Sequence, residues 1–215
     1  MGPVFHFYTR LNLPLLLGRK ARTIPELLAG LESAPGASVY YHTHRFLQQH
    51  HYLSPEPPND FAFWVTASLG LDALGERLAS VDTVKFRTIM SLRDKFVEIL
   101  KTYTKETGSP SPQSPPGEEF HFLSCRTFIL PTRHKARTLP EFLEVIRGVS
   151  INSIYFHMFE ARLRLERGEN DFSNWFEGIE KRDLAAEVAR LDPYTMTLEG
   201  LRKVLIQKVG RHVQN

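Results

Sequence analysis

The chain is almost without cysteine. Cys125 is the only one in 215 residues, so no disulfide can form within the chain, and a reducing, cytoplasmic location is expected. Long apolar runs are missing too: none approaches the roughly 20 residues that a membrane-spanning helix needs. No glycine-rich phosphate loop and no duplicated pair of nucleophile and base is present. We therefore expect no membrane insertion and no cofactor, and these absences argue against an enzyme.

A strong excess of one charge is also missing. Lys and Arg number 27 and Asp and Glu 24, which gives a net charge of +3 and a pI near 9.0. This mildly basic balance lacks the strong positive footprint typical of nucleic-acid-binding proteins. Apolar residues make up 42% of the chain, enough for one large globular domain or two smaller ones.

What the sequence does contain is a tandem duplication. Residues 5–47 align without a gap on residues 120–162. This self-similarity predicts two homologous units at 1–106 and 119–215, joined by a stiff linker at 107–118 that is rich in proline and serine. The shared residues include Phe5, His6 and Phe7 with Phe120, His121 and Phe122; Lys20 to Thr23 with Lys135 to Thr138; and Ser38, Tyr40 and His42 with Ser153, Tyr155 and His157.

Each unit is expected to be helical. Thr23 with Glu26, and Thr138 with Glu141, form capping boxes that predict helix starts. The Phe-His-Phe segments alternate apolar and polar residues, but three residues are too few to predict more than a short extended piece. The predicted fold is therefore all-α: two helical repeats packed as a bundle with pseudo-twofold symmetry. Further helices are predicted from Ser38 and Ser153, Asn59 and Asn170, Leu74 and Leu184, and Thr88 and Thr197.

Three motifs resemble a bacterial family known as a domain of unknown function. They are Ser38 to His44, Asn59 to Trp64 and Leu74 to Asp82, and the resemblance covers essentially the whole chain. It implies no reaction, ligand or catalytic residue. The second repeat departs from the first at Phe159, which stands where the first repeat has His44.

The duplicated histidines, His42 and His157, are the candidate catalytic or metal-binding residues. On a helix each lies on an inward stripe, so one imidazole from each repeat, helped by Asp60 and Asp171, is a candidate metal or acid–base site. The alternative is a buried histidine that hydrogen-bonds a tyrosine or a carbonyl group. For the aspartates, the alternative is a role in capping the helix that follows.

The repeated basic turns are candidate anion sites. Lys20 and Arg22, and likewise Lys135 and Arg137, precede a capped helix N-terminus, where free amides and the helix dipole favour an anion. The alternative is that these side chains are solvated or paired with nearby carboxylates.

Positions at which the repeats carry opposite charges are candidate contacts between them. Arg45 aligns with Glu160, and Arg77 aligns with Glu187. If such positions meet across a pseudo-twofold axis, they would form salt bridges that favour pairing within the chain.

These features favour a non-enzymatic binding or adaptor protein that recognises a protein partner or an anionic ligand. The first alternative is a metalloprotein or enzyme with a His and carboxylate site at the interface of the repeats. The second is nucleic-acid binding through Lys20, Arg22, Lys135 and Arg137. The sequence leaves the oligomeric state open.

Overall fold

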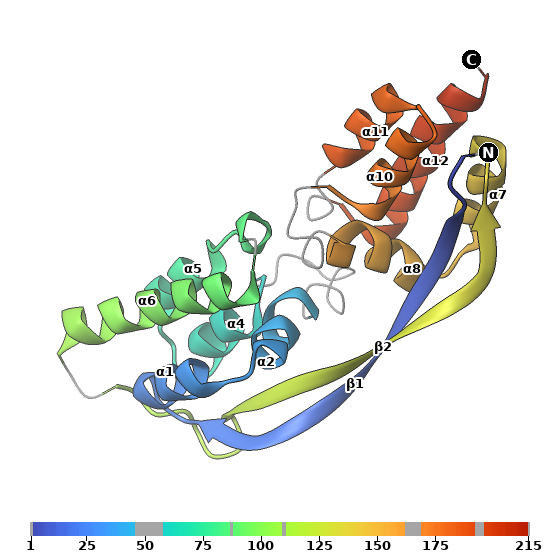
Figure 1. Ribbon diagram of the computed structural model, residues 1–215. Helices are drawn as coiled ribbons and strands as arrows, with labels where there is room; N and C mark the ends of the chain where they lie inside the picture. Colours follow the sequence, from blue (N-terminus) through green and yellow to red (C-terminus); the bar gives the residue numbers. More distant parts are fainter. Residues whose placement is uncertain are drawn as a thin grey trace. The chain divides into compact units, whose positions relative to one another are not determined.

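The chain folds into two compact units. The computed structural model describes residues 2–45, 58–86, 88–108, 111–161, 169–191 and 196–214 (Figure 1). One unit consists of Asn12–Arg126 and is called here the α1–α6 unit; the other consists of Met1–Leu11 together with Thr127–Asn215 and is called the α7–α12 unit. The compact units and the sequence repeats therefore do not contain the same residues.

Two long strands make the fold α/β. Strand β1 spans Phe5–Ala21 and β2 spans Phe120–Ala136, and they pair in an antiparallel two-stranded sheet (Figure 1). The predicted all-α fold is therefore wrong. The alternation of apolar and polar residues in Phe-His-Phe breaks at Tyr8 and Thr9 and resumes only at Leu11 and Leu13 in β1. Pro14 and Pro131 are tolerated because each strand of a two-stranded sheet has an edge where no amide is needed.

Each strand runs from one unit into the other. The first residues of β1 belong to the α7–α12 unit, where Phe5 and Phe7 enter its core. The first residues of β2 belong to the α1–α6 unit, where Phe120 and Phe122 enter the other core. The Phe-His-Phe segment of each sequence repeat thus completes the core made by the helices of the other repeat.

The α1–α6 unit contains the helices of the first repeat. The predicted starts after Thr23, Asn59 and Thr88 are confirmed, and each of these side chains accepts a first-turn backbone amide. Glu26 accepts the amide of Arg22, the residue before the cap, at 2.6 Å, whereas a full capping box would use the amide of Thr23 itself. The elements are α1 (Ile24–Ser33), α2 (Gly36–Tyr40), the π-helix η1 (Tyr41–Arg45), α4 (Asp60–Ala67), α5 (Asp72–Ala79), the short 3-10 helix η2 (Thr83–Lys85) and α6 (Ile89–Thr107).

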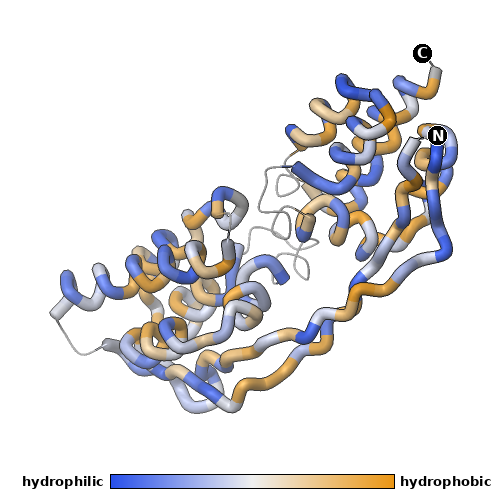
Figure 2. The backbone as a smooth tube through the Cα atoms, in the orientation of Figure 1, coloured by the Kyte–Doolittle hydropathy of each residue, from blue (hydrophilic) through white to orange (hydrophobic). Residues whose placement is uncertain are grey.

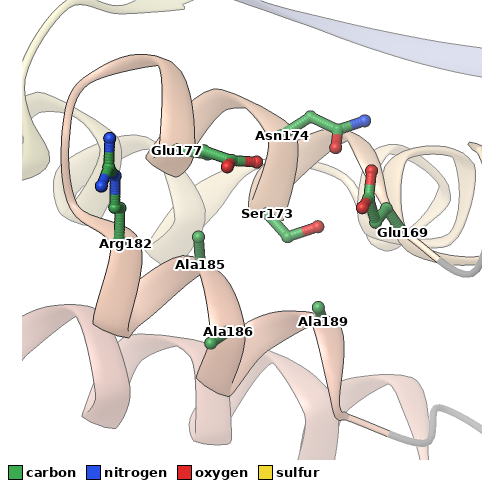
Figure 3. Close-up of a pocket in the computed structure, with 8 residues that line it drawn as sticks. All are labelled: Glu169, Ser173, Asn174, Glu177, Arg182, Ala185, Ala186 and Ala189. Atoms are coloured by element: carbon green, nitrogen blue, oxygen red, sulfur yellow. The ribbon is translucent and has the colours of Figure 1, made fainter.

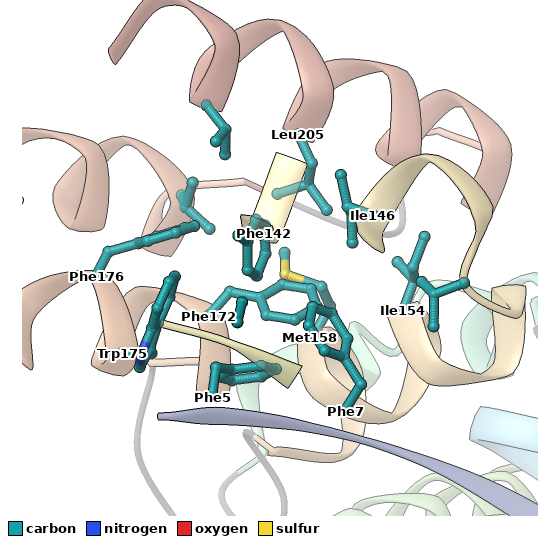
Figure 4. Packing of buried hydrophobic residues seen from close by; sticks show 14 of the residues in the cluster. Phe5, Phe7, Phe142, Ile146, Ile154, Met158, Phe172, Trp175, Phe176 and Leu205 are labelled. Atoms are coloured by element: carbon teal, nitrogen blue, oxygen red, sulfur yellow. The ribbon is translucent and has the colours of Figure 1, made fainter. Parts of the chain in front are cut away.

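The α7–α12 unit repeats this arrangement with the second set of helices. Its core gathers aromatic side chains from the strand and from several helices, among them Phe5, Phe142, Phe172 and Trp175 (Figure 4). Thr138 and Asn170 cap their helices as predicted. The elements are α7 (Leu139–Gly148), α8 (Ile151–Tyr155), the π-helix η3 (Phe156–Glu160), α10 (Asp171–Gly178), α11 (Arg182–Ala189) and α12 (Leu198–Gln214).

The described part of the linker packs on the α1–α6 unit. The Ser111 hydroxyl accepts the Ile24 amide at 3.1 Å, and the Ser114 amide donates to the Arg22 carbonyl at 2.8 Å. Ser114 is buried. The linker therefore supplies a hydrogen-bond acceptor to the N-terminus of α1, a position where free amides otherwise need a cap or water.

Candidate functional site

The side chain of His157 is hydrogen-bonded to the backbone of strand β1. Its Nε2 accepts the Tyr8 amide at 2.9 Å, and its Nδ1 lies 2.8 Å from Oδ2 of Asp171. A backbone amide can only donate, so Nε2 is the acceptor. Nδ1 therefore carries the ring hydrogen and donates a hydrogen bond to the carboxylate. The imidazole is 2% exposed and lies among aromatic rings, with ring-centre distances of 4.9 Å to Phe5 and 5.3 Å to Phe172.

Two further side chains bind carbonyl groups of the same strand segment. The Ser153 hydroxyl donates to the Tyr8 carbonyl at 2.6 Å. The indole Nε1 of Trp175 donates to the Pro3 carbonyl at 2.7 Å. Ser153 and Trp175, together with His157 and Asp171, are called here a strand clasp, because they hold an extended segment mainly by its backbone.

The α1–α6 unit has an equivalent strand clasp, made of Ser38, His42, Asp60 and Trp64. His42 Nε2 accepts the Leu123 amide at 2.9 Å, and its Nδ1 lies 2.6 Å from Asp60 Oδ2. Ser38 donates to the Leu123 carbonyl at 2.6 Å, and Trp64 donates to the Glu118 carbonyl at 2.7 Å. The residues that looked most like a duplicated active site therefore share one task in each unit.

Local structure explains how each histidine reaches its strand. His42 lies in η1 and His157 in η3, the wider helical turns that follow α2 and α8. A π-helical turn changes the direction in which side chains leave the helix. Asp60 and Asp171 occupy the first turn of α4 and α10, while the cap itself is the preceding asparagine. The two aspartates orient the imidazoles by the hydrogen bonds described above.

This geometry limits the chemistry available to the histidines. Both ring nitrogens of His42 and of His157 are engaged, one with a carboxylate and one with a strand amide. Binding a metal or moving a proton through Nε2 would require the strand amide to leave. Within the described residues, no group of three or more His, Cys, Asp or Glu side chains lies close enough to hold a metal ion.

The basic turns differ between the units. In the α1–α6 unit, the Arg22 guanidinium donates to the Ser114 carbonyl at 3.4 Å, so the linker occupies this helix start. In the α7–α12 unit, the Arg137 amide donates to Glu141 at 2.6 Å and its side chain is exposed. Lys20 and Lys135 are exposed as well. Anion binding at these turns stays a prediction.

The residues of opposite charge have partners within their own units. Arg77 pairs with Glu106 at 2.9 Å, and Glu187 pairs with Lys208 at 2.7 Å. Glu160 forms an ion pair with Arg10 of strand β1, and the Arg10 side chain is buried. The Arg45 guanidinium lies 5.9 Å from the centre of the Tyr41 ring. That Arg45 meets Glu160, or that Arg77 meets Glu187, stays a prediction.

The pKa values of Tyr41, Glu187 and Glu119 depart from their ordinary values. Burial raises the pKa of the Tyr41 phenol, against a lowering effect of Arg45. The hydrogen bond from Lys208 lowers the pKa of Glu187. A hydrogen bond from its own backbone lowers the pKa of Glu119, with a smaller contribution from Lys20. Burial and neighbouring charges explain these shifts, and none of them identifies a general acid or base.

A small pocket lies between α10 and α11 (Figure 3). Its volume is about 200 Å³, which is below the range of roughly 300 to 1,000 Å³ that is typical of sites for drug-sized ligands. Its lining includes charged residues of both signs, Glu169, Glu177 and Arg182, and three alanines of α11. Sequence reasoning missed it because most of its lining positions differ between the repeats. The lining residues are Glu169, Ser173, Asn174, Glu177, Arg182, Ala185, Ala186 and Ala189.

Each unit also exposes apolar strand residues. Exposure of these side chains ranges from 39% at Leu15 to 66% at Leu16, and the hydropathy colouring shows apolar stretches along both strands (Figure 2). Sequence reasoning missed this surface because it had not placed these residues in strands. In the α7–α12 unit they are Leu11, Phe128, Ile129 and Leu130, and in the α1–α6 unit Leu13, Leu15 and Leu16.

The chain belongs to the Family of unknown function (DUF5752), whose model matches residues 2–210. Among solved structures it is similar to OrfY from Thermoproteus tenax, with 26% sequence identity and a TM-score of 0.79 over 97% of this chain and 95% of that chain. A comparison with curated proteins gives no match. Within its described residues, no helix is both long and apolar enough to cross a membrane.

Proposed function

We propose that this protein is a non-enzymatic binding protein that recognises a protein partner through the exposed apolar residues of β1 and β2. One observation carries the proposal: each unit leaves large apolar strand side chains in solvent, such as Leu16 and Ile129. Clusters of exposed apolar residues typically mark interaction sites. A strand with an open edge also offers unpaired amides and carbonyls to a partner.

The strand clasps support a binding role over a catalytic one. The histidines, aspartates and serines that the repeats share hold strands, and their polar atoms are engaged in doing so. An acid–base or metal site at His42 and His157 would compete with the hydrogen bonds that fasten Tyr8 and Leu123. A cytoplasmic location belongs to the same proposal, because a chain with one thiol suits a reducing compartment.

The test compares affinity capture by two full-length proteins. The wild type and a Phe128→Ser, Leu130→Ser variant are immobilised and exposed to lysate of the source cells, and retained proteins are identified by mass spectrometry. A partner that binds the wild type and is lost from the variant supports the proposal. The control is Phe63→Ser with Met90→Ser, which removes exposed apolar side chains from α4 and α6 instead of from a strand.

Two results would contradict the proposal. One is an identical set of retained proteins on the wild type and on the strand variant. The other is loss of the same partner from the helix control, which would place the binding surface elsewhere. Thermal melts of all three proteins check that the fold is intact, which is the expected result because the substitutions lie at exposed positions.

A further inference from the structure

Strands β1 and β2 contain no acidic residue. Their 34 residues, 17 in each strand, include arginines, lysines and histidines but neither Asp nor Glu. The chain as a whole has nearly as many acidic as basic side chains. The positive charge of the strands is therefore a local property, and it accompanies the exposed apolar residues.

In β2 the apolar and basic residues follow one another along one exposed stretch. Phe128, Ile129 and Leu130 come first, and Arg133 and Lys135 follow. All five are exposed, and no ion pair among the described residues involves Arg133 or Lys135. Arg10 of β1 is different, because it is buried against Glu160. Arg133 and Lys135 thus present charges that the described part of the protein does not neutralise by direct pairing.

The same order occurs in β1 within the α1–α6 unit. Leu13, Leu15 and Leu16 precede Arg19 and Lys20, and all five are exposed. Lys20 aligns with Lys135 in the duplication, and Leu13 with Phe128. Each unit therefore carries one exposed strand stretch that is apolar first and basic afterwards. Because the pattern occurs in both units, a partner can meet the same chemistry twice on one chain.

We infer that the partner is a protein with extended segments in which apolar residues are accompanied by a run of Asp or Glu, one segment for each unit. The inference rests on the proposed function and adds the chemistry of the partner to it. Apolar side chains of the segment cover the strand leucines and Phe128, while its carboxylates pair with Arg133 and Lys135. An extended segment can also pair with the open edge of a strand, since β1 and β2 form a sheet of only two strands among the described residues.

Charge favours an acidic segment over a second copy of the chain. Two copies meeting through these strands would bring two acid-free, basic surfaces together, and like charges on facing strands are destabilising. The composition of the surface favours protein over single-stranded nucleic acid, which is bound mainly by stacking on aromatic side chains. Within the exposed stretches of both units, leucine and isoleucine predominate and Phe128 is the aromatic residue.

The test measures peptide binding to the full-length protein by fluorescence anisotropy. The probes are a labelled peptide with an apolar stretch followed by glutamates and the same peptide with lysines in place of the glutamates. We expect the acidic peptide to bind at least about tenfold more tightly, with the difference shrinking as ionic strength rises from about 0.05 M to about 0.5 M. Equal binding of the two peptides would overturn the inference and leave the proposed function standing.

Two double variants distinguish the effect of the basic residues on the strands from the effect of the protein's net charge. Arg133→Gln with Lys135→Gln is expected to remove the peptide site of the α7–α12 unit and leave that of the α1–α6 unit, so the amount of acidic peptide bound at saturation falls to about half. Lys181→Gln with Lys203→Gln removes the same charge from exposed positions outside the strands and is expected to leave binding unchanged. An equal loss in both variants would contradict the inference. So would tighter binding of a labelled oligonucleotide, or of vesicles containing anionic lipid, than of the acidic peptide.

A different result would contradict the proposed function. If the Phe128→Ser, Leu130→Ser variant binds as much acidic peptide at saturation as the wild type does, although only the α1–α6 unit keeps its apolar stretch, then the apolar strand surface is not the binding site. In that case charge alone governs binding, and both the function and the inference are wrong.

Discussion

The backbone of Tyr8 is held by two side chains far away in the sequence. His157 Nε2 accepts its amide at 2.9 Å across 149 residues, and Ser153 donates to its carbonyl at 2.6 Å. Leu123 is held in the same way by His42 and Ser38. A strand residue usually exchanges both backbone hydrogen bonds with another strand. Here a helix supplies them through a serine and a histidine.

The first prediction concerns this contact. His157→Ala should lower the free energy of unfolding by about 2–4 kcal/mol, because it leaves the Tyr8 amide and the Asp171 carboxylate without their partner. Chemical denaturation measures the loss, and hydrogen exchange should show reduced protection of the Tyr8 amide. The control is His134→Ala, at an exposed strand position, with an expected change within about 0.5 kcal/mol. A stable His157→Ala protein with a protected Tyr8 amide would show that the clasp does not hold the strand.

The second prediction concerns the buried pair Arg10 and Glu160. Arg10 lies 4.7 Å from the centre of the Tyr155 ring, and its side chain is almost fully buried. Arg10→Ala should destabilise the protein by about 3–5 kcal/mol, since it leaves a carboxylate in a largely buried position. Adding Glu160→Ala should recover part of this loss, with a coupling energy of about 1–3 kcal/mol in a double-mutant cycle.

An exposed ion pair provides the comparison for this cycle. Lys101 and Glu32 lie 2.6 Å apart on the surface of the α1–α6 unit, with both side chains about half exposed. Their coupling energy should stay below about 1 kcal/mol. Equal coupling energies for the two pairs would mean that burial adds nothing to the interaction between Arg10 and Glu160.

The third prediction concerns Gly30 in α1. A Cβ atom at this position would lie 2.1 Å from Cζ of the Phe122 ring, which belongs to the strand segment that completes the core. Gly30→Ala should therefore destabilise the protein by about 1–3 kcal/mol, although alanine favours a helix. Gly148→Ala at the end of α7 is the control, because its Cβ would have no atom within 4 Å. If both changes had the same effect on the melting temperature, the strand would not pack closely on α1.

The fourth prediction concerns Glu180, which has a left-handed backbone with φ of 63°. Gly70, just before α5, has φ of 65° in the corresponding turn before the fourth helix of its unit. Glu180→Gly should stabilise the protein by about 1 kcal/mol, because this conformation is unfavourable for residues with a Cβ. Gly70→Ala should destabilise it by a similar amount. The two melting temperatures should move in opposite directions, and a shared direction would contradict the backbone argument.

Helix starts were the part of the fold most accessible to sequence reasoning. Thr23, Thr138, Asn59 and Asn170 all cap helices as their spacing predicts, because a cap depends on residues within one turn. The strands were missed. Their apolar alternation is interrupted by Pro14 and Pro131, and few β-branched residues mark them as strands. Three alternating residues were too short a signal by themselves.

The candidate site was only partly accessible. Duplication correctly drew attention to Ser153, His157, Asp171 and Trp175, since each is shared by both repeats at matching positions. Their task depends on the Pro3 and Tyr8 backbones, which carry no side-chain signature of the contact. No pattern along the sequence could therefore have identified the partner of each side chain.

The sequence by itself determined the duplication, the helix starts and the identity of the clasp residues, because these depend on neighbours along the chain. Only the tertiary structure decided which helices cover each Phe-His-Phe segment. The two Phe-His-Phe tripeptides are identical, so each segment is chemically suited to either core. The hydrogen bonds from Tyr8 to His157 and from Leu123 to His42 show that each segment packs with the helices of the other repeat. Packing between distant parts of the chain makes that choice, and local preferences carry no information about it.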